Sequence, residues 1–165
     1  MGNLLGIDPS TVASGYSVLN HLGELLDYGV IKPNKNKLNE AQQAIYQYTK
    51  LKELMETHDI KMIACEDQHR GPNADTFKKL SRVSGYVILL AGQFDVPISI
   101  YQPSSWRKLT HGKGNVNKAF TRQWVNDTYN LSFKKKDEDI TDSIGIAHAL
   151  LNQINEENIT LLEQT

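Results

Sequence analysis

Four acidic residues lie at positions where a carboxylate is costly unless it meets positive charge. These residues are Asp8, Glu66, Asp139 and Asp142. Asp8 and Glu66 each follow four apolar or small residues, a pattern typical of a buried strand. An unpaired charge inside a protein is unfavourable, so acids at such positions predict a nearby cation. The chemistry that this set favours is the binding of a divalent metal ion.

Asp139 and Asp142 are separated by only two residues. If they open a helix, both carboxylates lie on one face of its first turn. They also lie at the positive end of the helix dipole, which favours negative charge. All four acids can then converge on one point, provided that the strands ending in Asp8 and Glu66 are neighbours.

Basic residues gather in two segments, although the formal charge of the chain is only -1. No acid occurs between Asp95 and Asp127, and this interval contains Arg107, Lys108, Lys113, Lys118 and Arg122. The other segment follows Glu66 and contains Arg70, Lys78, Lys79 and Arg82. Such segments predict a surface that binds the phosphates of a nucleic acid. The alternative is that these side chains only keep the surface soluble.

The candidate residues lie on a predicted alternation of strands and helices. Apolar patterning predicts strands over residues 2–8, 14–20, 25–31, 61–66 and 97–101. Helical spacing predicts helices over residues 39–58, 75–94 and 117–129, and a final helix from about residue 139. Residues 102–116 contain one proline and two glycines and are predicted to form a loop.

This order of elements, β-β-β-α-β-α-β-α-α, is typical of an α/β fold. Short turns favour an antiparallel meander of the first three strands, and the fourth strand is expected beside the first. Glu66 would then lie next to Asp8. We therefore predict a five-stranded mixed sheet flanked by helices on both faces, in a single domain spanning residues 1–165.

Composition argues against several classes of protein. The single cysteine, Cys65, cannot form an internal disulfide and is expected to be a small core residue. No apolar run approaches the roughly 20 residues that cross a bilayer, and the first residues lack the pattern of a secretion signal. We expect a cytoplasmic protein with no membrane partner.

Three motifs in this order resemble the RuvC family of Holliday-junction resolvases. They are Gly6-Ile7-Asp8-Pro9, Glu66-Asp67-Gln68 and Asp139-Ile140-Thr141-Asp142. Supporting matches are Asn73-Ala74, Lys79-Leu80 and the stretch from Gly112 to Lys118. The resemblance spans nearly the whole chain. The small size and near-neutral charge are more similar to a bacteriophage-encoded member, which would act in the host cytoplasm, than to a cellular one.

The resemblance implies an RNase H-like fold and a homodimer that places paired, symmetric nicks across a four-way DNA junction. It also implies two Mg²⁺ ions per active site, for which Mn²⁺ can substitute. The metal ligands would be Asp8, Glu66, Asp139 and Asp142. Two such ions about 4 Å apart can activate water and stabilise the leaving 3′ oxygen. In our hypothesis Asp8 bridges both ions, while Asp139 binds metal or orients water.

DNA binding is assigned to the basic segments and to His69, which stands where the family often has a base-stacking aromatic ring. The residues are His69, Arg70, Lys78, Lys79, Arg82, Arg107, Lys108, Lys113, Lys118 and Arg122. A guanidinium binds phosphate but is a poor proton donor, so the catalytic role near the scissile phosphate is assigned to Lys118 and not to Arg107. Because histidine stacks less strongly, selectivity for four-way over three-way DNA stays open.

Several aromatic and histidine residues have simpler interpretations. Helical spacing makes Phe120 and Trp124 core residues, whereas Trp106 can either pack inside or approach DNA. His148 has no expected partner.

Small residues on the helix over 75–94 would allow close packing against a second subunit. They are Ser84, Gly85, Ala91 and Gly92. Dimerisation through this helix is therefore a hypothesis.

Three other functions remain as alternatives. An actin-like nucleotide-binding protein also begins with a strand, an acid and a hairpin, but it needs a second domain. A non-catalytic module for branched DNA would use the acids only as helix caps. A ribonuclease or single-strand nuclease on the same fold would share the metal chemistry.

Overall fold

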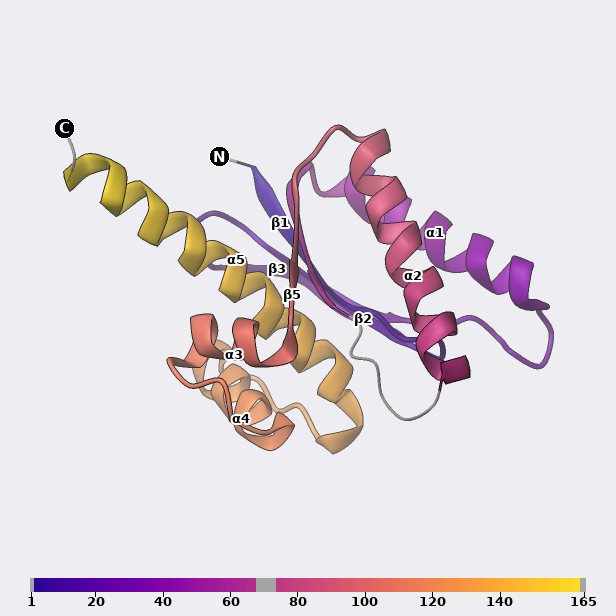
Figure 1. The fold of residues 1–165 in the computed structure, drawn as a ribbon. Helices are drawn as coiled ribbons and strands as arrows, with labels where there is room; N and C mark the ends of the chain where they lie inside the picture. Colours follow the sequence, from indigo (N-terminus) through magenta and orange to yellow (C-terminus); the bar gives the residue numbers. More distant parts are fainter. Residues whose placement is uncertain (1, 68–73, 164–165) are drawn as a thin grey trace.

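The computed structural model describes residues 2–67 and 74–163, and Figure 1 shows their arrangement. The strands are β1 (Asn3–Asp8), β2 (Ser14–Leu19), β3 (Leu25–Ile31), β4 (Ile60–Glu66) and β5 (Ile98–Tyr101). The helices are α1 (Glu40–Thr57), α2 (Ala74–Gln93), α3 (Pro103–His111), α4 (Lys118–Tyr129) and α5 (Glu138–Glu163), with a short 3₁₀ turn at Lys135–Asp137. His69 and Arg70 lie outside the described residues. None of the described helices combines the length and apolar character needed to cross a bilayer.

All five strands belong to one mixed sheet in the order β3-β2-β1-β4-β5. The first three strands form the predicted antiparallel meander, while β4 pairs in parallel with both β1 and β5. The predicted adjacency of the first and fourth strands is therefore confirmed. In the register of this pair Ile7 lies beside Cys65, so the next residue of each strand, Asp8 and Glu66, stands at the same edge of the sheet.

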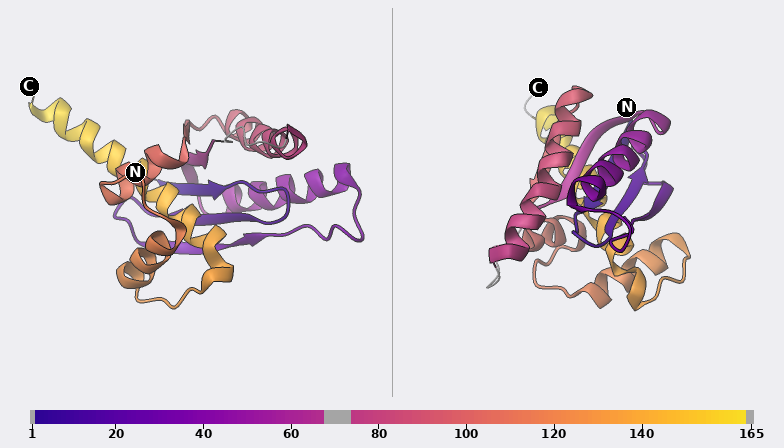
Figure 2. Two further views of the ribbon diagram at one scale, coloured as in Figure 1. Left: turned by 60° about the horizontal axis from the view of Figure 1, so that its bottom comes forward. Right: turned by 90° about the vertical axis from the view of Figure 1, so that its right-hand side faces the viewer.

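Helices cover both faces of the sheet, as predicted, and each face has its own apolar core (Figure 2). Side chains alternate along a strand, so neighbouring residues of β1 enter different cores. Leu5 and Ile7 pack against α1 and α2, where Leu51 and Val87 contribute. Leu4 instead joins the core formed with α3 and α5. Helix α1 begins after Asn39, which is its N-cap and forms a capping box with Gln42.

The prediction of a loop over residues 102–116 is wrong, because residues Pro103–His111 form α3. Proline is tolerated in the first turn of a helix, where its missing N–H would have no helical partner. Gly112 ends the helix in a left-handed conformation with φ of 73°, which glycine adopts without strain. The proline and the first glycine therefore mark the two ends of a helix. A signal for α3 was present in the helical spacing of Trp106 and Leu109, both of which enter the core.

A polar and aromatic contact network holds α4 against α5, and it corrects the expectation that His148 lacks a partner. Tyr129 Oη donates to the carbonyl oxygen of Gly23 at 2.7 Å, and His148 Nε2 lies within hydrogen-bond distance of the same hydroxyl. The hydroxyl has one hydrogen, so His148 must donate from Nε2 to Tyr129. Trp124 packs edge-on to the His148 ring with 4.9 Å between ring centres. Phe120 was expected in the core but is 49% exposed.

His148 makes the stability of the fold depend on pH. Burial, and then the charge of His111, lowers the pKa of His148 to about 4. An unfolded histidine, with a pKa near 6.5, takes up a proton before the native one does. Native stability due to His148 is therefore present above about pH 6.5 and is lost as the pH falls toward about 4.

We predict that wild type loses up to about 3 kcal/mol of stability relative to His148→Gln between pH 6.5 and pH 4. Urea unfolding at a series of pH values measures the difference between the two free energies of unfolding. Taking the difference cancels the titration of other groups. A difference that stays constant over this range would contradict the prediction.

Candidate active site

Two of the four acids end the central parallel strands. Asp8 is the last residue of β1 and Glu66 is the last residue of β4. Leu4 and Ala64 belong to the core on the α5 side, and strand side chains alternate between faces. Asp8 and Glu66 therefore point to the same side of the sheet as α5, and the predicted meeting of these two acids is confirmed.

The other two acids lie at the start of α5, as the spacing predicted. Asp139 is in the first turn of α5, and Asp142 follows three residues later. The start of this helix can lie directly on the sheet because β1 and β2 carry glycines beneath it. A Cβ atom on Gly6 would collide with the carbonyl oxygen of Ser143, and one on Gly15 would collide with that of Asp139. These two glycines are thus positioning residues that the sequence analysis did not identify.

Lys118 is directed at these carboxylates. Its Nζ atom lies 2.9 Å from Asp142 Oδ2 and 4.0 Å from Asp8 Oδ2. A lysine at the start of a helix opposes the positive end of the helix dipole, and Lys118 is the first residue of α4. The acids opposite it compensate for this unfavourable position. Lys118, for which the sequence predicted a catalytic role near the scissile phosphate, therefore lies beside Asp8 and Asp142.

Burial makes the negative charge of the acids costly. It raises the pKa of Asp8 well above its ordinary value, and the Glu66 carboxylate raises it further while Lys118 opposes the change. Burial likewise raises the pKa of Asp142, again opposed by Lys118. The Asp142 side chain is only 1% exposed, and its Oδ1 atom has no hydrogen-bond partner among the described residues.

The donor set fits a hard divalent cation. Ions of this kind prefer carboxylate oxygens, and the buried, unpartnered Oδ1 atom of Asp142 is a group that a metal would satisfy. In this conformation the described residues contain no group of three or more His, Cys, Asp or Glu side chains close enough together to hold a metal ion. The ammonium group of Lys118 lies among the carboxylates and supplies part of the positive charge in this conformation.

Trp106 adds a contact that the sequence analysis missed. Its Nε1–H donates to Glu66 Oε2 at 2.6 Å, and its side chain is fully buried. Of the two positions left open for Trp106, the structure shows the one inside the protein. Arg107, the next residue, places its guanidinium carbon 4.9 Å from the centre of the Trp106 ring. Arg107 Nε is buried without a hydrogen-bond partner in the described part of the chain.

The remaining predicted DNA-binding residues are distributed over several elements. Lys78, Lys108 and Lys113 are exposed. Arg122 instead forms an ion pair with Glu138 at the start of α5, so it holds α4 against α5. His69 and Arg70 fall outside the described residues.

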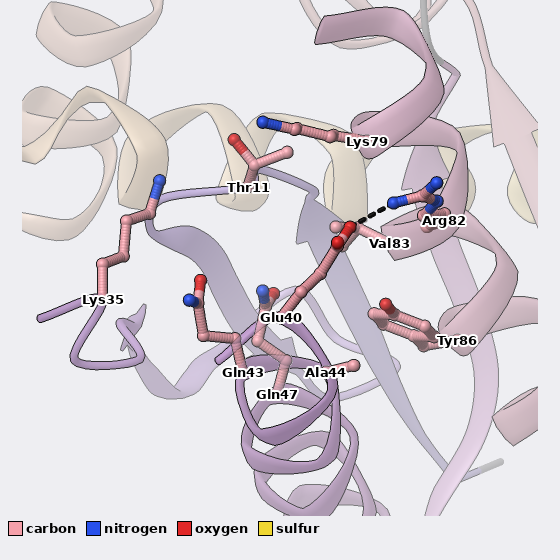
Figure 3. Close-up of a pocket in the computed structure, with 10 residues that line it drawn as sticks. All are labelled: Thr11, Lys35, Glu40, Gln43, Ala44, Gln47, Lys79, Arg82, Val83 and Tyr86. Carbon is pink, nitrogen blue, oxygen red and sulfur yellow. Dashed lines mark hydrogen bonds and ion pairs between the residues drawn. The ribbon is translucent and has the colours of Figure 1, made fainter. Parts of the chain in front are cut away.

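Lys79 and Arg82 line a pocket of about 270 Å³ between the first halves of α1 and α2 (Figure 3). Arg82 pairs with Glu40 across this pocket, while Lys79 extends toward Thr11 on the turn after β1. The basic residues predicted on α2 therefore lie near the turn that follows Asp8.

The cost of burying these acids has a measurable consequence in metal-free protein. The raised pKa of Asp8 means that the native state holds its proton more tightly than the unfolded state. Stability from this residue therefore falls as the pH rises from the unfolded pKa, near 4, through the raised native value. An asparagine cannot ionise, so it removes this loss.

We predict that Asp8→Asn raises the melting temperature of metal-free protein at pH 7.5 by at least about 2–4 °C, the shift that 1 kcal/mol gives in a chain of this size. The gain should shrink as the pH approaches 4. Asp127→Asn, the same change on an exposed part of α4, should leave the melting temperature nearly unchanged. A melting temperature of Asp8→Asn below that of wild type would refute the electrostatic account.

Comparison with known sequences identifies relatives along most of the chain. The family model described as crossover junction endodeoxyribonuclease RuvC matches residues 4–149. RuvC of Protochlamydia amoebophila is 29% identical over 148 residues, which cover 87% of each chain. RuvC of Chlorobium phaeovibrioides is 30% identical over 148 residues, covering 87% of this chain and 78% of the relative.

Solved structures show the same α/β architecture, an RNase H-like fold. Thermus thermophilus RuvC has a TM-score of 0.82 at 19% identity, covering 94% of this chain and 96% of that one. T. thermophilus RuvC in complex with Holliday junction substrate has a TM-score of 0.80 at 17% identity over the same shares. The yeast mitochondrial Holliday junction resolvase Ydc2 is more distant, with a TM-score of 0.52 at 16% identity over 90% of this chain and 78% of that chain. Because the family model covers most of the sequence, this chain belongs to the crossover junction endodeoxyribonuclease RuvC family.

Proposed function

We propose that this protein is a metal-dependent endonuclease that nicks four-way DNA junctions. The observation that carries the proposal is the convergence of Asp8, Glu66 and Asp142 with Lys118 at one edge of the sheet. Family membership supports the same function, as does the similarity to a RuvC structure that contains a Holliday junction. The substrate class rests on this kinship, whereas the cleavage chemistry also rests on the site itself.

The acids are proposed to hold the metal ions. Two Mg²⁺ ions, or Mn²⁺ in their place, would supply activation of water and stabilisation of the leaving 3′ oxygen. Asp8 is proposed to contact both ions, Glu66 and Asp142 to contact one each, and Asp139 to ligate metal or orient water. Burial of Asp142 supports its role, because its Oδ1 atom is buried without a hydrogen-bond partner among the described residues.

Lys118 is proposed to act on the scissile phosphate. Its side chain is 45% exposed although its ammonium group contacts buried Asp142. It can therefore reach both the acids and a phosphodiester that lies across them. A lysine provides a compact positive charge with three donors, which suits the negative charge that develops on phosphate oxygens.

The DNA backbone is proposed to follow basic residues on both sides of the acids. Arg107, Lys108 and Lys113 come from α3 and the segment after it, and Lys78 and Lys79 come from α2. The orphaned Nε atom of Arg107 is a donor that a phosphate oxygen could satisfy. We assign Arg122 to the α4–α5 contact because it already pairs with Glu138.

A homodimer is proposed to form through the outer face of α2. Gly85, Ile88, Leu89 and Gly92 are all exposed there, at the spacing of a single helix face. Ile88 and Leu89 are 49% and 56% exposed, so an apolar surface is available to a second copy. Ala91, which was expected on this surface, is only 3% exposed and packs in the core.

Cytoplasmic location and a single domain over residues 1–165 are part of the proposal and are consistent with DNA as the substrate. Bacteriophage origin and the breadth of branched-DNA selectivity stay predictions. The alternatives differ in outcome: a non-catalytic module would bind junctions without cutting them, and an actin-like protein would bind nucleotide.

The decisive experiment maps nicks in labelled four-way, three-way and linear DNA, with and without Mg²⁺. Wild type should place symmetric paired nicks in the four-way junction, and only with metal. Asp8→Asn should cut at least about 10³-fold more slowly, because lost metal coordination costs several kcal/mol in the transition state, while metal-free junction affinity is retained. Asp127→Asn should cut like wild type.

Each other outcome of this assay has a definite meaning. Equal cutting of three-way and four-way DNA would replace the resolvase by a broader debranching nuclease. Binding without cutting in any metal would leave a DNA-binding module, and near-normal cutting by Asp8→Asn would refute the assignment of the site.

The dimer can be tested separately with Leu89→Glu. The substitution places a charge twice in the proposed symmetric interface, so it should weaken dimerisation at least tenfold, or about 1.4 kcal/mol. Sedimentation or light scattering at several concentrations would show a shift toward monomer. Leu22→Glu, at a leucine that is 72% exposed in the β2–β3 turn, should not change the oligomeric state. A Leu89→Glu protein as dimeric as wild type would exclude this face.

A further inference from the structure

Trp106 links two elements that carry acids of the site. Its indole N–H donates to Glu66 Oε2 at 2.6 Å. Its side chain has no exposed surface. The bond therefore forms away from competing water, where an electrostatic contact is stronger than at the surface.

The other side of the indole rests on α5. A Cβ atom on Gly145 would lie 2.7 Å from Trp106 Cζ3, so the ring occupies space that only a glycine leaves. Gly145 is one turn after Asp142 on the same helix. The ring thus touches the helix that carries Asp142 while its N–H holds the acid at the end of β4.

Helix α3 is itself fixed to α5 by two hydrogen bonds near its carboxyl end. Thr110 Oγ1 donates to the carbonyl oxygen of Gly145 at 2.7 Å. Asn152 Nδ2 donates to the carbonyl oxygen of Leu109 at 2.9 Å. Trp106 consequently has little freedom to move relative to α5, and the Glu66 carboxylate is held relative to that helix as well.

We infer that Trp106 is a positioning residue, whose indole N–H fixes the Glu66 carboxylate in the orientation that ligates metal and whose ring sets the spacing between β4 and α5. The inference rests on the proposed metal-dependent function. An ionised carboxylate has about four acceptor positions, so one N–H donor is compatible with metal ligation. Hydrogen bonds of this kind to metal ligands change metal affinity or activity about 10–100-fold when they are removed.

The direct test is Trp106→Phe, which keeps an aromatic ring and removes the N–H. The Mg²⁺ concentration for half-maximal junction cleavage should rise about tenfold or more. The rate should recover in large part at saturating metal, and junction affinity without metal should stay at the wild-type value. Trp124→Phe is the matched control, because it makes the same chemical change on α4, at a tryptophan that packs against His148.

A second measurement does not depend on cleavage or on the stability of Trp106→Phe. The chain has two tryptophans, so in Trp124→Phe the indole of Trp106 is the only one that fluoresces. Titration of this protein with Mg²⁺, without DNA, should shift the emission of Trp106, because metal on Glu66 changes the charge beside the indole N–H. Adding Glu66→Gln to the same background should abolish the shift.

The outcomes separate this inference from the proposed function. The role of Trp106 would be overturned if folded Trp106→Phe protein cleaved with the metal dependence of wild type. It would also be overturned if Trp124→Phe protein cleaved junctions but its fluorescence did not respond to Mg²⁺. A metal response that survives Glu66→Gln would overturn it too. Failure of wild type to cut junctions would contradict the proposed function instead, and the fluorescence titration would still decide whether Trp106 reports on metal at Glu66.

Discussion

The structure depends on holding several carboxylates close together where water is largely excluded. Like charges repel strongly at low dielectric, and burial alone raises the pKa of Asp8 and of Asp142. No single feature offsets this cost. Lys118 provides a positive charge, Trp106 provides an N–H donor, and the positive end of α5 faces the same point. Each feature comes from a different segment, so the site forms only when the whole fold has formed.

Direct contact between the backbones of α5 and the sheet brings the acid-bearing segments together. The start of α5 approaches β1 and β2 at Gly6 and Gly15, where any side chain would collide with helix carbonyls. Farther along the same helix, Gly145 leaves space for the indole of Trp106. In a closely packed interior, a small shift of one element moves its neighbours. The distances between the carboxylates therefore depend on how α5 packs on the sheet. Catalysis by metal ions requires such fixed geometry, since coordination tolerates little error.

Much of this arrangement could be predicted from local patterns. Acids directly after apolar strands marked Asp8 and Glu66, and the three-residue spacing marked Asp139 and Asp142. Contacts between distant segments were less accessible. Nothing in the sequence near Trp106 indicates that its N–H reaches Glu66, forty residues away. Pro103 and Gly112 were interpreted as loop residues because each has that meaning more often than it marks a helix end. Phe120 shows the opposite failure: helical spacing suggested burial, but the face of α4 that carries it is turned to solvent.

The ion pair between Lys118 and Asp142 has a consequence for how the protein is made. Many metal sites exist only in the holo state, because without the ion the ligands repel one another and the chain unfolds. Here the lysine serves as an internal counter-ion for the most buried acid. This edge of the sheet can therefore fold before metal binds. A newly synthesised chain can fold and accumulate without metal and without activity. The concentration of metal then controls whether the protein is active, and not whether it is folded.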